Sequence, residues 1–469
     1  MPTQEQYNTT KQRARKLYAK INLLNYRFQT VDEWENVVVG NPTFNIDSNS
    51  DIRRTCSISL IPIDKSFDVA YGNKIWIDKY IQIYLGIEDI HTKEIVYTNM
   101  GIYMVENPSK SYSATDNTFT IQGIDLMAKL TGLRNGNLEG LPHLIPQGSN
   151  IRNTIIETIK LGGFNNYVVE EFPIVTPMDI NIDIGGTIYD ILKSLLDILP
   201  NYQMYFDVDG VFHCDKIPSG KNEQIMVDDD IWGKVLISYN QNYDFDNIKN
   251  VIEVYGKTHD VDNFNNATIS GSTIRLNIAN ITSLYDGTKF GFIVPSKVNN
   301  PYIILNSFGT KPLKDEYGNF AQLSDEPNVY YVATYVQQGD YYLFLGEITP
   351  HAEIKETNPN SPFYVNGTMG EVRIVLSGGE YDNIYTSNLA QERAKWELYK
   401  RCRLQDNITL TCVPIYWLDV NWLVEITLPN KNGREGTAQY MIKSINTDFS
   451  TNGSQTINLM RYYSYYDFE

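Results

Sequence analysis

The sequence predicts a mainly β protein with a smaller α+β module, and three observations support this fold class. Apolar and polar residues alternate over many short segments, which indicates half-buried strands. One region instead repeats its apolar residues every three to four positions, the spacing of amphipathic helices. The chain has 469 residues, enough for about three domains of ~150 residues each, so we expect several hydrophobic cores.

Residues 1–145 are predicted to form an antiparallel β-barrel. Alternation with a period of two marks strands at 56–60 and 81–85, and the pattern continues through 102–121. Residues 124–130 have the pattern of a short helix that ends before a glycine. No motif in this region indicates a catalytic site.

Residues 146–235 are predicted to form a small α+β module. Asn150 is suited to cap a helix whose isoleucines recur every four residues from 151 to 159. Thr187 and Asp190 resemble a capping box at the start of a second helix with one continuous apolar stripe. An Asp-Gly pair at 209–210, between two strand-like runs, then predicts a hairpin with φ > 0 at both turn positions.

Strand patterns return after residue 235 and predict a second barrel built from two separated segments. Residues 251–255 and 371–376 are assigned to strands of this barrel, whose segments are 236–260 and 366–469. Between these segments, residues 261–365 are rich in Asn, Gly and Tyr, are punctuated by proline and contain short strand patterns. We therefore predict a β-rich insertion that interrupts the second barrel.

The composition argues against tight nucleic-acid binding and against membrane insertion. The formal net charge is -17, whereas proteins that hold duplex DNA neutralise phosphates with Lys and Arg. An acidic surface could still line a passage through which DNA moves without binding. No stretch approaches ~18 consecutive apolar residues, and the N-terminus lacks the pattern of a signal peptide.

A basic cluster lies near the N-terminus, from Lys11 to Lys20. It is either a solvated arm or an electrostatic tether to an acidic neighbouring subunit, and the sequence leaves both open. The cysteines form no Cys-x-x-Cys pair, which favours reduced thiols and assembly in a bacterial host cytoplasm. These cysteines are Cys56, Cys214, Cys402 and Cys412.

We predict no catalytic, cofactor-binding or metal-ligating residues. The five histidines are too far apart in sequence for a His-x-His or His-Glu-x-x-His site. His213 and Cys214 are neighbours, but adjacent strand residues point to opposite faces. Residues 207–210 resemble the start of a calcium loop, yet Pro218 stands where the closing Glu is required. A pair of carboxylates for acid/base chemistry is defined by its separation in space, which the sequence spacing of residues in a β-rich chain does not reveal.

Three stretches resemble the tail-hub, or baseplate hub, proteins of phages and related contractile injection systems. The first covers 185–218 and includes "FDVDGVFHCDKIP". The second is the helix-like "NLAQERAKWELYKR", with Asn388 and Gln391 as a capping pair, followed by "ITLTCVPIYWLDVNWLVEITLP". The third is the hairpin "YMIKSINTDFSTNGSQTINLMRYY", with an Asn-Gly turn at 452–453.

The resemblance implies two tube-like antiparallel β-barrels per subunit and a homotrimer in which six barrels imitate a six-membered ring. Such a ring joins the six-fold tail tube protein to a three-fold spike or tail-tip protein, among the surrounding baseplate proteins of a virion tail. The resemblance further implies a structural protein without enzymatic activity or cofactor. Residues 261–365 do not match the family's pattern, so their role is open.

An alternative from another class is a cell-wall carbohydrate-binding or hydrolytic tail-tip protein. In that case residues 261–365 would be the binding or active module. The 34 tyrosines suit subunit interfaces, but they also suit sugar-binding platforms. Oligomeric state and sugar binding distinguish the two hypotheses. A tail fibre is a weaker third option, because the sequence contains no shaft-like repeat.

Overall fold

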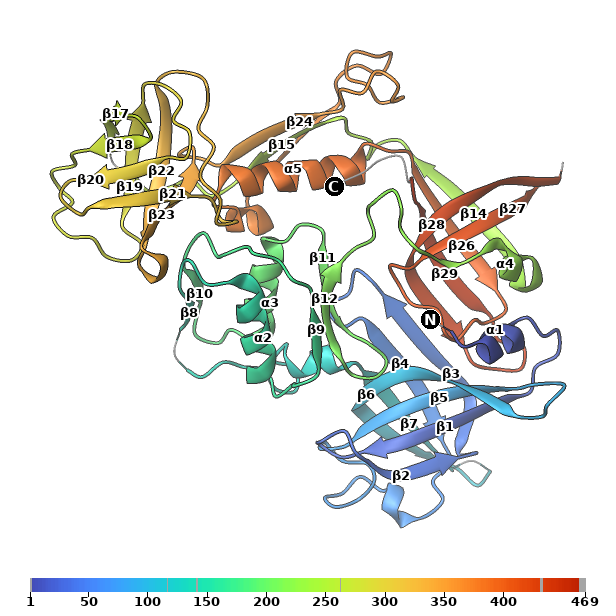
Figure 1. Cartoon of the computed structure of the whole chain (residues 1–469). Helices are drawn as coiled ribbons and strands as arrows, with labels where there is room; N and C mark the ends of the chain where they lie inside the picture. Colours follow the sequence, from blue (N-terminus) through green and yellow to red (C-terminus); the bar gives the residue numbers. More distant parts are fainter. Residues whose placement is uncertain (1, 116, 141, 262, 431–432, 464–469) are drawn as a thin grey trace.

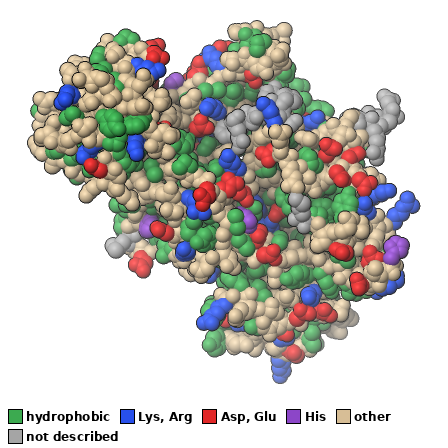
Figure 2. Space-filling model, viewed as in Figure 1, with side chains coloured by type: hydrophobic (Ala, Val, Ile, Leu, Met, Phe, Trp, Pro, Cys, Tyr) green, Lys and Arg blue, Asp and Glu red, His purple; other side chains and the backbone are tan. Residues whose placement is uncertain are grey.

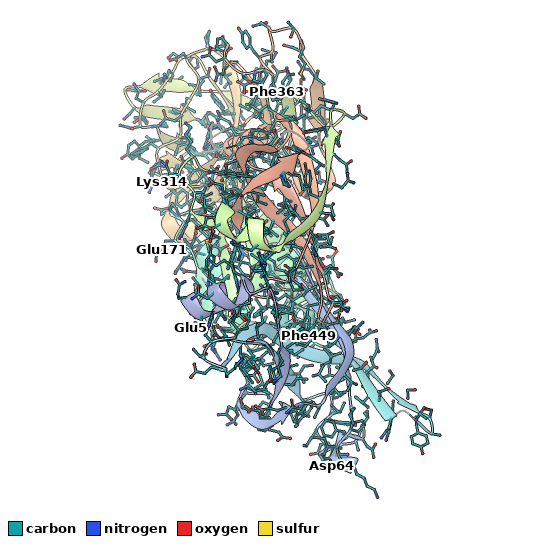
Figure 3. The ribbon with its side chains drawn as sticks, turned by 90° about the vertical axis from the view of Figure 1, so that its right-hand side faces the viewer. Glu5, Asp64, Glu171, Lys314, Phe363 and Phe449 are labelled. Atoms are coloured by element: carbon teal, nitrogen blue, oxygen red, sulfur yellow. The ribbon has the colours of Figure 1, made fainter. Side chains whose placement is uncertain are left out.

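Strands dominate the structure, a computed structural model that describes residues 2–115, 117–140, 142–261, 263–430 and 433–463 (Figure 1). The predicted mainly β class with an α+β module is confirmed. The molecule is elongated, with Asp64 and Phe363 near its two ends (Figure 3). Among the described residues, no helix is long and apolar enough to cross a membrane.

One sheet of 13 strands contains most of the N-terminal and C-terminal parts of the chain. Its N-terminal strands are β1 (Leu17–Leu24), β2 (Thr30–Glu35), β3 (Val38–Asp47), β4 (Arg54–Leu60), β5 (Tyr80–Glu88), β6 (Ile95–Tyr112) and β7 (Asn117–Ile124). Its later strands are β13 (Ile225–Val227), β14 (Leu236–Asp244), β26 (Gln405–Cys412), β27 (Leu423–Asn430), β28 (Gly433–Asp448) and β29 (Gln455–Arg461). Along its main path the order is β14-β26-β29-β28-β3-β4-β7-β6-β5-β1-β2.

The two predicted barrels are joined through a single antiparallel pair, β28 with β3. In its register Asn446 lies opposite Asn45, so segments from the two ends of the chain share one ladder. The N-terminal half packs around its own core, which includes Ile21, Phe44 and Ile83. The C-terminal half has a separate core. The barrels are thus two halves of one sheet rather than two separate sheets.

Short helices flank these two halves. They are α1 (Gln4–Thr10) and α4 (Asp229–Val235), with the 3-10 turns η1 (Lys65–Phe67) and η2 (Leu126–Lys129). The helix predicted at 124–130 is only the 3-10 turn η2, because the Asp125 carboxylate accepts from the Met127 amide and fixes a tight turn. Asp228 caps α4 through the amide of Asp230.

The α+β module lies between the large sheet and the other sheets of the chain (Figure 1). Its elements are β8 (His143–Ile145), α2 (Ile151–Leu161), β9 (Tyr167–Val169), β10 (Ile180–Ile182), α3 (Ile188–Asp197), β11 (Tyr202–Phe206) and β12 (Phe212–Lys216). Asn150 caps α2 and the Thr187–Asp190 capping box starts α3, as predicted. The β11–β12 hairpin also forms as predicted. However, only Gly210 has positive φ in its turn, since the Asp207 carboxylate shapes the loop by accepting from two backbone amides.

A separate three-stranded sheet differs from the prediction. Its strands are β15 (Val251–Tyr255), β24 (His351–Lys355) and β25 (Arg373–Leu376). The sequence assigned the first and last of these to the second barrel, but β15 instead pairs with β24 and β25. The 3-10 turn η4 (Gly379–Asn383) and helix α5 (Ser387–Arg401) follow. Helix α5 begins before the predicted Asn388 because Thr386 is the cap and accepts from the Leu389 amide.

Within residues 261–365, eight strands form a sheet with its own core (Figure 1, yellow). They are β16 (Phe264–Asn266), β17 (Thr268–Ser270), β18 (Thr273–Leu276), β19 (Lys289–Val294), β20 (Tyr302–Leu305), β21 (Thr310–Lys314), β22 (Val329–Val336) and β23 (Tyr341–Gly346), with the 3-10 turn η3 (Gln337–Gly339). We call this eight-stranded unit the insertion sheet. Strand β24 also lies within 261–365 but belongs to the three-stranded sheet.

Candidate functional site

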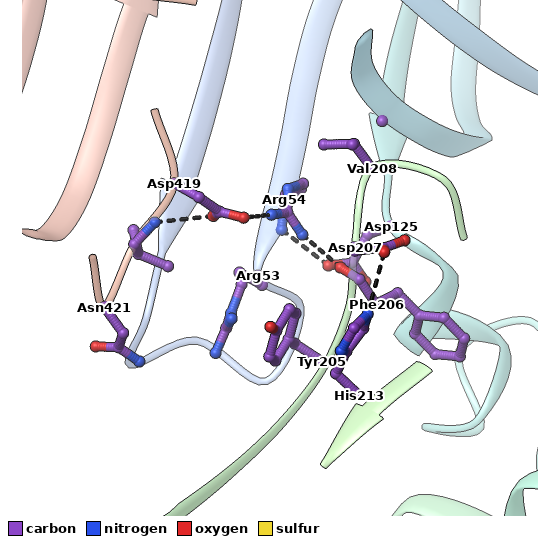
Figure 4. A network of polar contacts seen from close by, with 12 residues as sticks. Arg53, Arg54, Asp125, Tyr205, Phe206, Asp207, Val208, His213, Asp419 and Asn421 are labelled. Carbon is purple, nitrogen blue, oxygen red and sulfur yellow. Dashed lines mark hydrogen bonds and ion pairs between the residues drawn. The ribbon is translucent and has the colours of Figure 1, made fainter. Parts of the chain in front are cut away.

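A buried ion pair connects three parts of the chain where the two halves of the large sheet meet (Figure 4). The Arg54 guanidinium, from the start of β4, forms an ion pair with Asp419 in the loop before β27. It also donates to the carbonyl of Phe206 at the end of β11. Arg54 is only 1% exposed, whereas the Asp419 side chain is 18% exposed, so the guanidinium is the end of the pair that is removed from water. The N-terminal half, the module and the C-terminal half therefore meet at one side chain.

A second carboxylate holds the Arg54 backbone in place. Asp125 accepts from the Arg54 amide at 2.8 Å and from the Met127 amide at 2.9 Å. Burial raises the pKa of Asp125, and the hydrogen bonds to both amides oppose that rise. Burial alone would lower the pKa of Arg54, but the neighbouring Asp419 raises it, so the guanidinium stays charged.

Arg53, the residue before Arg54, makes further polar contacts where the three parts of the chain meet. Its guanidinium donates to the Gln203 side chain at 2.8 Å and lies 4.0 Å from the centre of the Tyr205 ring. The same Gln203 oxygen accepts from the Asn421 amide at 2.7 Å. Lys443 donates to the Asn421 oxygen at 3.2 Å, and burial lowers the pKa of Lys443 to about 8. We call Arg53, Arg54, Asp125, Gln203, Asp419 and Asn421 the junction.

The junction can fix geometry rather than carry out chemistry. Arg54 contacts Asp419 and a backbone carbonyl, Asp125 accepts from two backbone amides, and Arg53 donates to the Gln203 side chain. Buried charges whose partners are satisfied in this way resist separation. No pattern in the sequence predicted the junction as a whole. One signal was available, since Arg54 shares the strand parity of Cys56, Ile58 and Leu60, all of which face the core. An arginine on the apolar face of a strand indicates a buried partner.

The N-terminal segment also binds the C-terminal half. Lys11 forms an ion pair with Asp230 at 2.9 Å, and Arg15 donates to the carbonyls of Pro414 and Thr10. The Trp417 indole donates to the Thr10 hydroxyl at 3.0 Å. Part of the basic cluster is therefore used for contacts within the chain.

Strand β14 is at one end of the large sheet and pairs only with β26 among the described strands. Its other edge is open, and apolar side chains project beside it: Ile237 is 60% exposed, Tyr243 is 54% exposed, and Phe245, just after the strand, is 72% exposed. An open edge without charged side chains is a template for pairing with another chain. The strand carries no charged residue before Asp244.

The insertion sheet is attached to the module and to α5 through buried polar groups. Thr334 donates to Gln147 at 3.2 Å, and both side chains are buried. Glu316, which is fully buried, accepts from the Thr386 hydroxyl at 2.8 Å, and its carbonyl accepts from the Val175 amide at 3.0 Å. Burial raises the pKa of Glu316 to about 7.

The side chains considered for metal binding on sequence grounds make contacts that stabilise the fold. His213 lies 3.1 Å from Asp207 and stacks on Tyr205, while the neighbouring Cys214 is fully buried on the opposite face. Asp207 also accepts from the amides of its own turn. Within the described part of the chain, no group of three or more His, Cys, Asp or Glu is placed to hold a metal ion.

Comparison with known proteins gives tail proteins among the similar structures. The chain is similar to the 43 kDa tail protein of prophage MuSo2 from Shewanella oneidensis, with 10% identity over 94% of this chain and 98% of that one, at a TM-score of 0.48. A tail protein from Neisseria meningitidis has 8% identity over 95% and 96%, also at 0.48. Both structures are described as tail proteins.

A third similar structure comes from Escherichia coli, with 9% identity over 92% of this chain and 75% of that one, at a TM-score of 0.42. It is described as a component of the type VI secretion system with structural similarity to T4 bacteriophage tail proteins. A family model described as a domain of unknown function, DUF5048, matches residues 360–466. No curated protein matches.

Proposed function

We propose that this chain is a structural tail or baseplate hub. In this proposal three copies form a ring with a central passage, and the ring joins a six-fold tail tube protein to a three-fold spike or tail-tip protein. The protein works in a virion tail or injection-particle baseplate and acts by assembly rather than by catalysis. The insertion sheet, on the periphery of the chain, contacts surrounding baseplate proteins.

The observation that carries the proposal is the continuous sheet that runs through both halves of the chain. An adaptor has to hold two tube-like units at a fixed angle while load passes between its partners. The β28–β3 pairing and the ion pair between Arg54 and Asp419 supply that rigidity. A flexible linker between two separate barrels would not.

Assembly with further copies is supported by the open edge of β14. Its free edge offers a template for pairing with another strand, and covering the exposed Ile237 and Tyr243 would remove apolar surface from water. Pairing with an identical chain in a head-to-tail manner buries them and closes a ring when the rotation closes.

The charge of the chain supports a passage that does not grip nucleic acid. The net charge is -17, and acidic and basic side chains are interspersed on the face shown in Figure 2. Tight phosphate binding depends on clustered Lys and Arg.

Mass photometry of the purified chain, alone and with its tube and spike proteins, tests the proposal. Three chains of 53.8 kDa should give a species of about 161 kDa, alone or upon addition of a partner. A stable dimer, or a monomer that joins neither partner, contradicts the hub function. Release of soluble products from peptidoglycan would favour the hydrolytic alternative.

A further inference from the structure

A cavity lies between the C-terminal end of α5, the C-terminal half of the large sheet and the segment that follows β12. Its volume is about 510 Å³, which is within the range of ligand-binding pockets. Four cations line it, namely Lys400, Arg401, Arg403 and Lys443. We call this cavity the cationic pocket. Its positive charge contrasts with the formal net charge of -17 of the whole chain.

Arg403 is the most buried of these cations, with 1% of its surface exposed. Its guanidinium donates to the Tyr399 carbonyl at 2.6 Å and lies 3.9 Å from the centre of the Tyr399 ring. That ring stacks on Trp396, with the ring centres 5.2 Å apart. These contacts hold the guanidinium in one position. Among the described residues, however, no carboxylate forms an ion pair with it, and a buried cation without an anionic partner is costly.

Lys443 enters the cationic pocket from β28. Its ammonium group donates to the Asn421 side chain at 3.2 Å. Burial lowers the pKa of Lys443 to about 8, the charges of three nearby cations including Arg403 lower it further, and Asp47 opposes the change. Asp47 is not within ion-pair distance in the described part of the chain, so the ammonium group is surrounded by more positive than negative charge.

The carboxylates near the cationic pocket do not balance its cations. Glu397 is shared by three of the nearby cations, with Lys400 at 2.6 Å, Arg401 at 3.0 Å and Arg393 at 3.3 Å. Asp244 also lines the pocket, but its carboxylate accepts from two backbone amides of its own turn. An excess of positive charge therefore remains, and the pocket should attract an anionic group.

The other lining side chains indicate which kind of anion fits. Apolar groups come from Ile217, Trp396, Met441 and Met460, and methionine adapts its shape to varied apolar ligands. Amide groups come from Asn247, Gln405 and Asn407. An amide side chain can both donate and accept, which matches a peptide backbone, whereas a free phosphate supplies mainly acceptors. The lining therefore favours a ligand that combines carboxylates with apolar side chains and a backbone.

We propose that the cationic pocket binds an acidic peptide segment of a partner protein. A carboxylate of the segment binds Arg403 and Lys443, because a guanidinium and an ammonium group form strong charge-assisted hydrogen bonds with it. An apolar side chain of the segment packs against Met441 and Met460. The site lies within a single chain, so it goes beyond the hub function and does not require the ring.

Fluorescence anisotropy with two labelled peptides tests the site. The probe is Glu-Phe-Asp-Leu-Glu, and its uncharged match is Gln-Phe-Asn-Leu-Gln. At about 0.15 M salt, where long-range attraction is screened, the acidic peptide should bind at least about tenfold more tightly than the uncharged one. Lys443→Gln should weaken binding of the acidic peptide about tenfold. Lys297→Gln makes the same change of charge on the distant insertion sheet and should leave the affinity unchanged.

Circular dichroism of each variant shows whether it folds. If Lys443→Gln does not fold, Lys400→Gln replaces it, because the Lys400 side chain is 39% exposed, and it should weaken binding about threefold. Equal affinity for the two peptides overturns the proposal, and so does equal affinity of the pocket variant and Lys297→Gln. Displacement of the acidic peptide by an equal concentration of inorganic phosphate also overturns it, since the pocket would then hold a simple anion. None of these results depends on whether the chain forms a trimer.

Discussion

Arg54 and Asp419 are separated by 365 residues in sequence, yet they form an ion pair at the point where the two halves of the large sheet and the module meet. Arg54 is almost fully buried, and it also donates to the Phe206 carbonyl. The ion pair therefore fixes the position of the N-terminal half relative to the C-terminal half. The stability and the assembly of the protein should therefore both depend on it.

Replacing Asp419 with Ala should lower the free energy of unfolding by about 3 kcal/mol, because Arg54 would remain buried without its carboxylate. Urea denaturation followed by tryptophan fluorescence measures the change. Asp246→Ala, an exposed carboxylate on the turn after β14, is the matched control and should change stability by less than about 0.5 kcal/mol. Equal effects of the two variants would show that the junction does not hold the halves together.

Replacing Glu316 with Gln should make the protein more stable than the wild type at high pH and remove part of its pH dependence. The pKa of Glu316 is raised from 4.5 to about 7 in the folded chain, so the folded state binds more protons than the unfolded state between these values. The stabilising protonation is complete below pH 4.5 and is lost as the pH rises through about 7.

The advantage of Glu316→Gln over the wild type should therefore grow to at most about 3 kcal/mol between pH 5 and pH 8. Thermal unfolding across this range measures it. Glu347→Gln, an exposed neighbour of the insertion sheet, should follow the wild type at every pH. A constant difference between Glu316→Gln and the wild type would mean that the carboxyl is not protonated in the folded state.

Removing the insertion sheet should leave a soluble chain that still assembles. The amide of His259 donates to the Ile348 carbonyl at 2.7 Å, so a short Gly-Ser linker can replace residues 260–347 without moving either end. The wider deletion of 262–364, at the boundaries predicted from the sequence, also removes β24 from its pairing with β15 and should be less stable. Circular dichroism and mass photometry compare the two. Aggregation of the narrower deletion would show that the insertion sheet is part of the main fold.

Adding charge to the open edge should prevent assembly. Ile237→Lys and Tyr243→Lys place a cation beside the free backbone groups of β14, where pairing with another strand would desolvate it. The mass of the assembled species should fall to that of one chain, with circular dichroism unchanged. Tyr285→Lys, at an exposed tyrosine of the insertion sheet, should still assemble. If both β14 variants remain trimeric, another surface forms the ring.

Local patterns in the sequence predicted the strands, the α2 and α3 helices and the β11–β12 hairpin, because each is specified by neighbouring residues. The caps at Asn150 and Thr187 were found for this reason. Partners far away in sequence could not be found in this way. Period-two alternation in β15 is compatible with any sheet, and its pairing with β24 and β25 depends on packing against α5.

The junction was missed for a related reason. Asp419 lies in an irregular loop, and no spacing in the sequence relates it to Arg54. The start of α5 is a second feature that local sequence could not predict, because it depends on a distant contact. Asn388 and Thr386 are both good caps, and only the contact between Thr386 and Glu316 of the distant insertion favours the earlier residue.

Electron microscopy of the isolated protein at the concentration where it assembles tests the central claim most directly. Three-lobed rings with an open centre are expected, with the insertion sheet at the outer rim. Closed particles of two copies, or three copies arranged without a central opening, would contradict it.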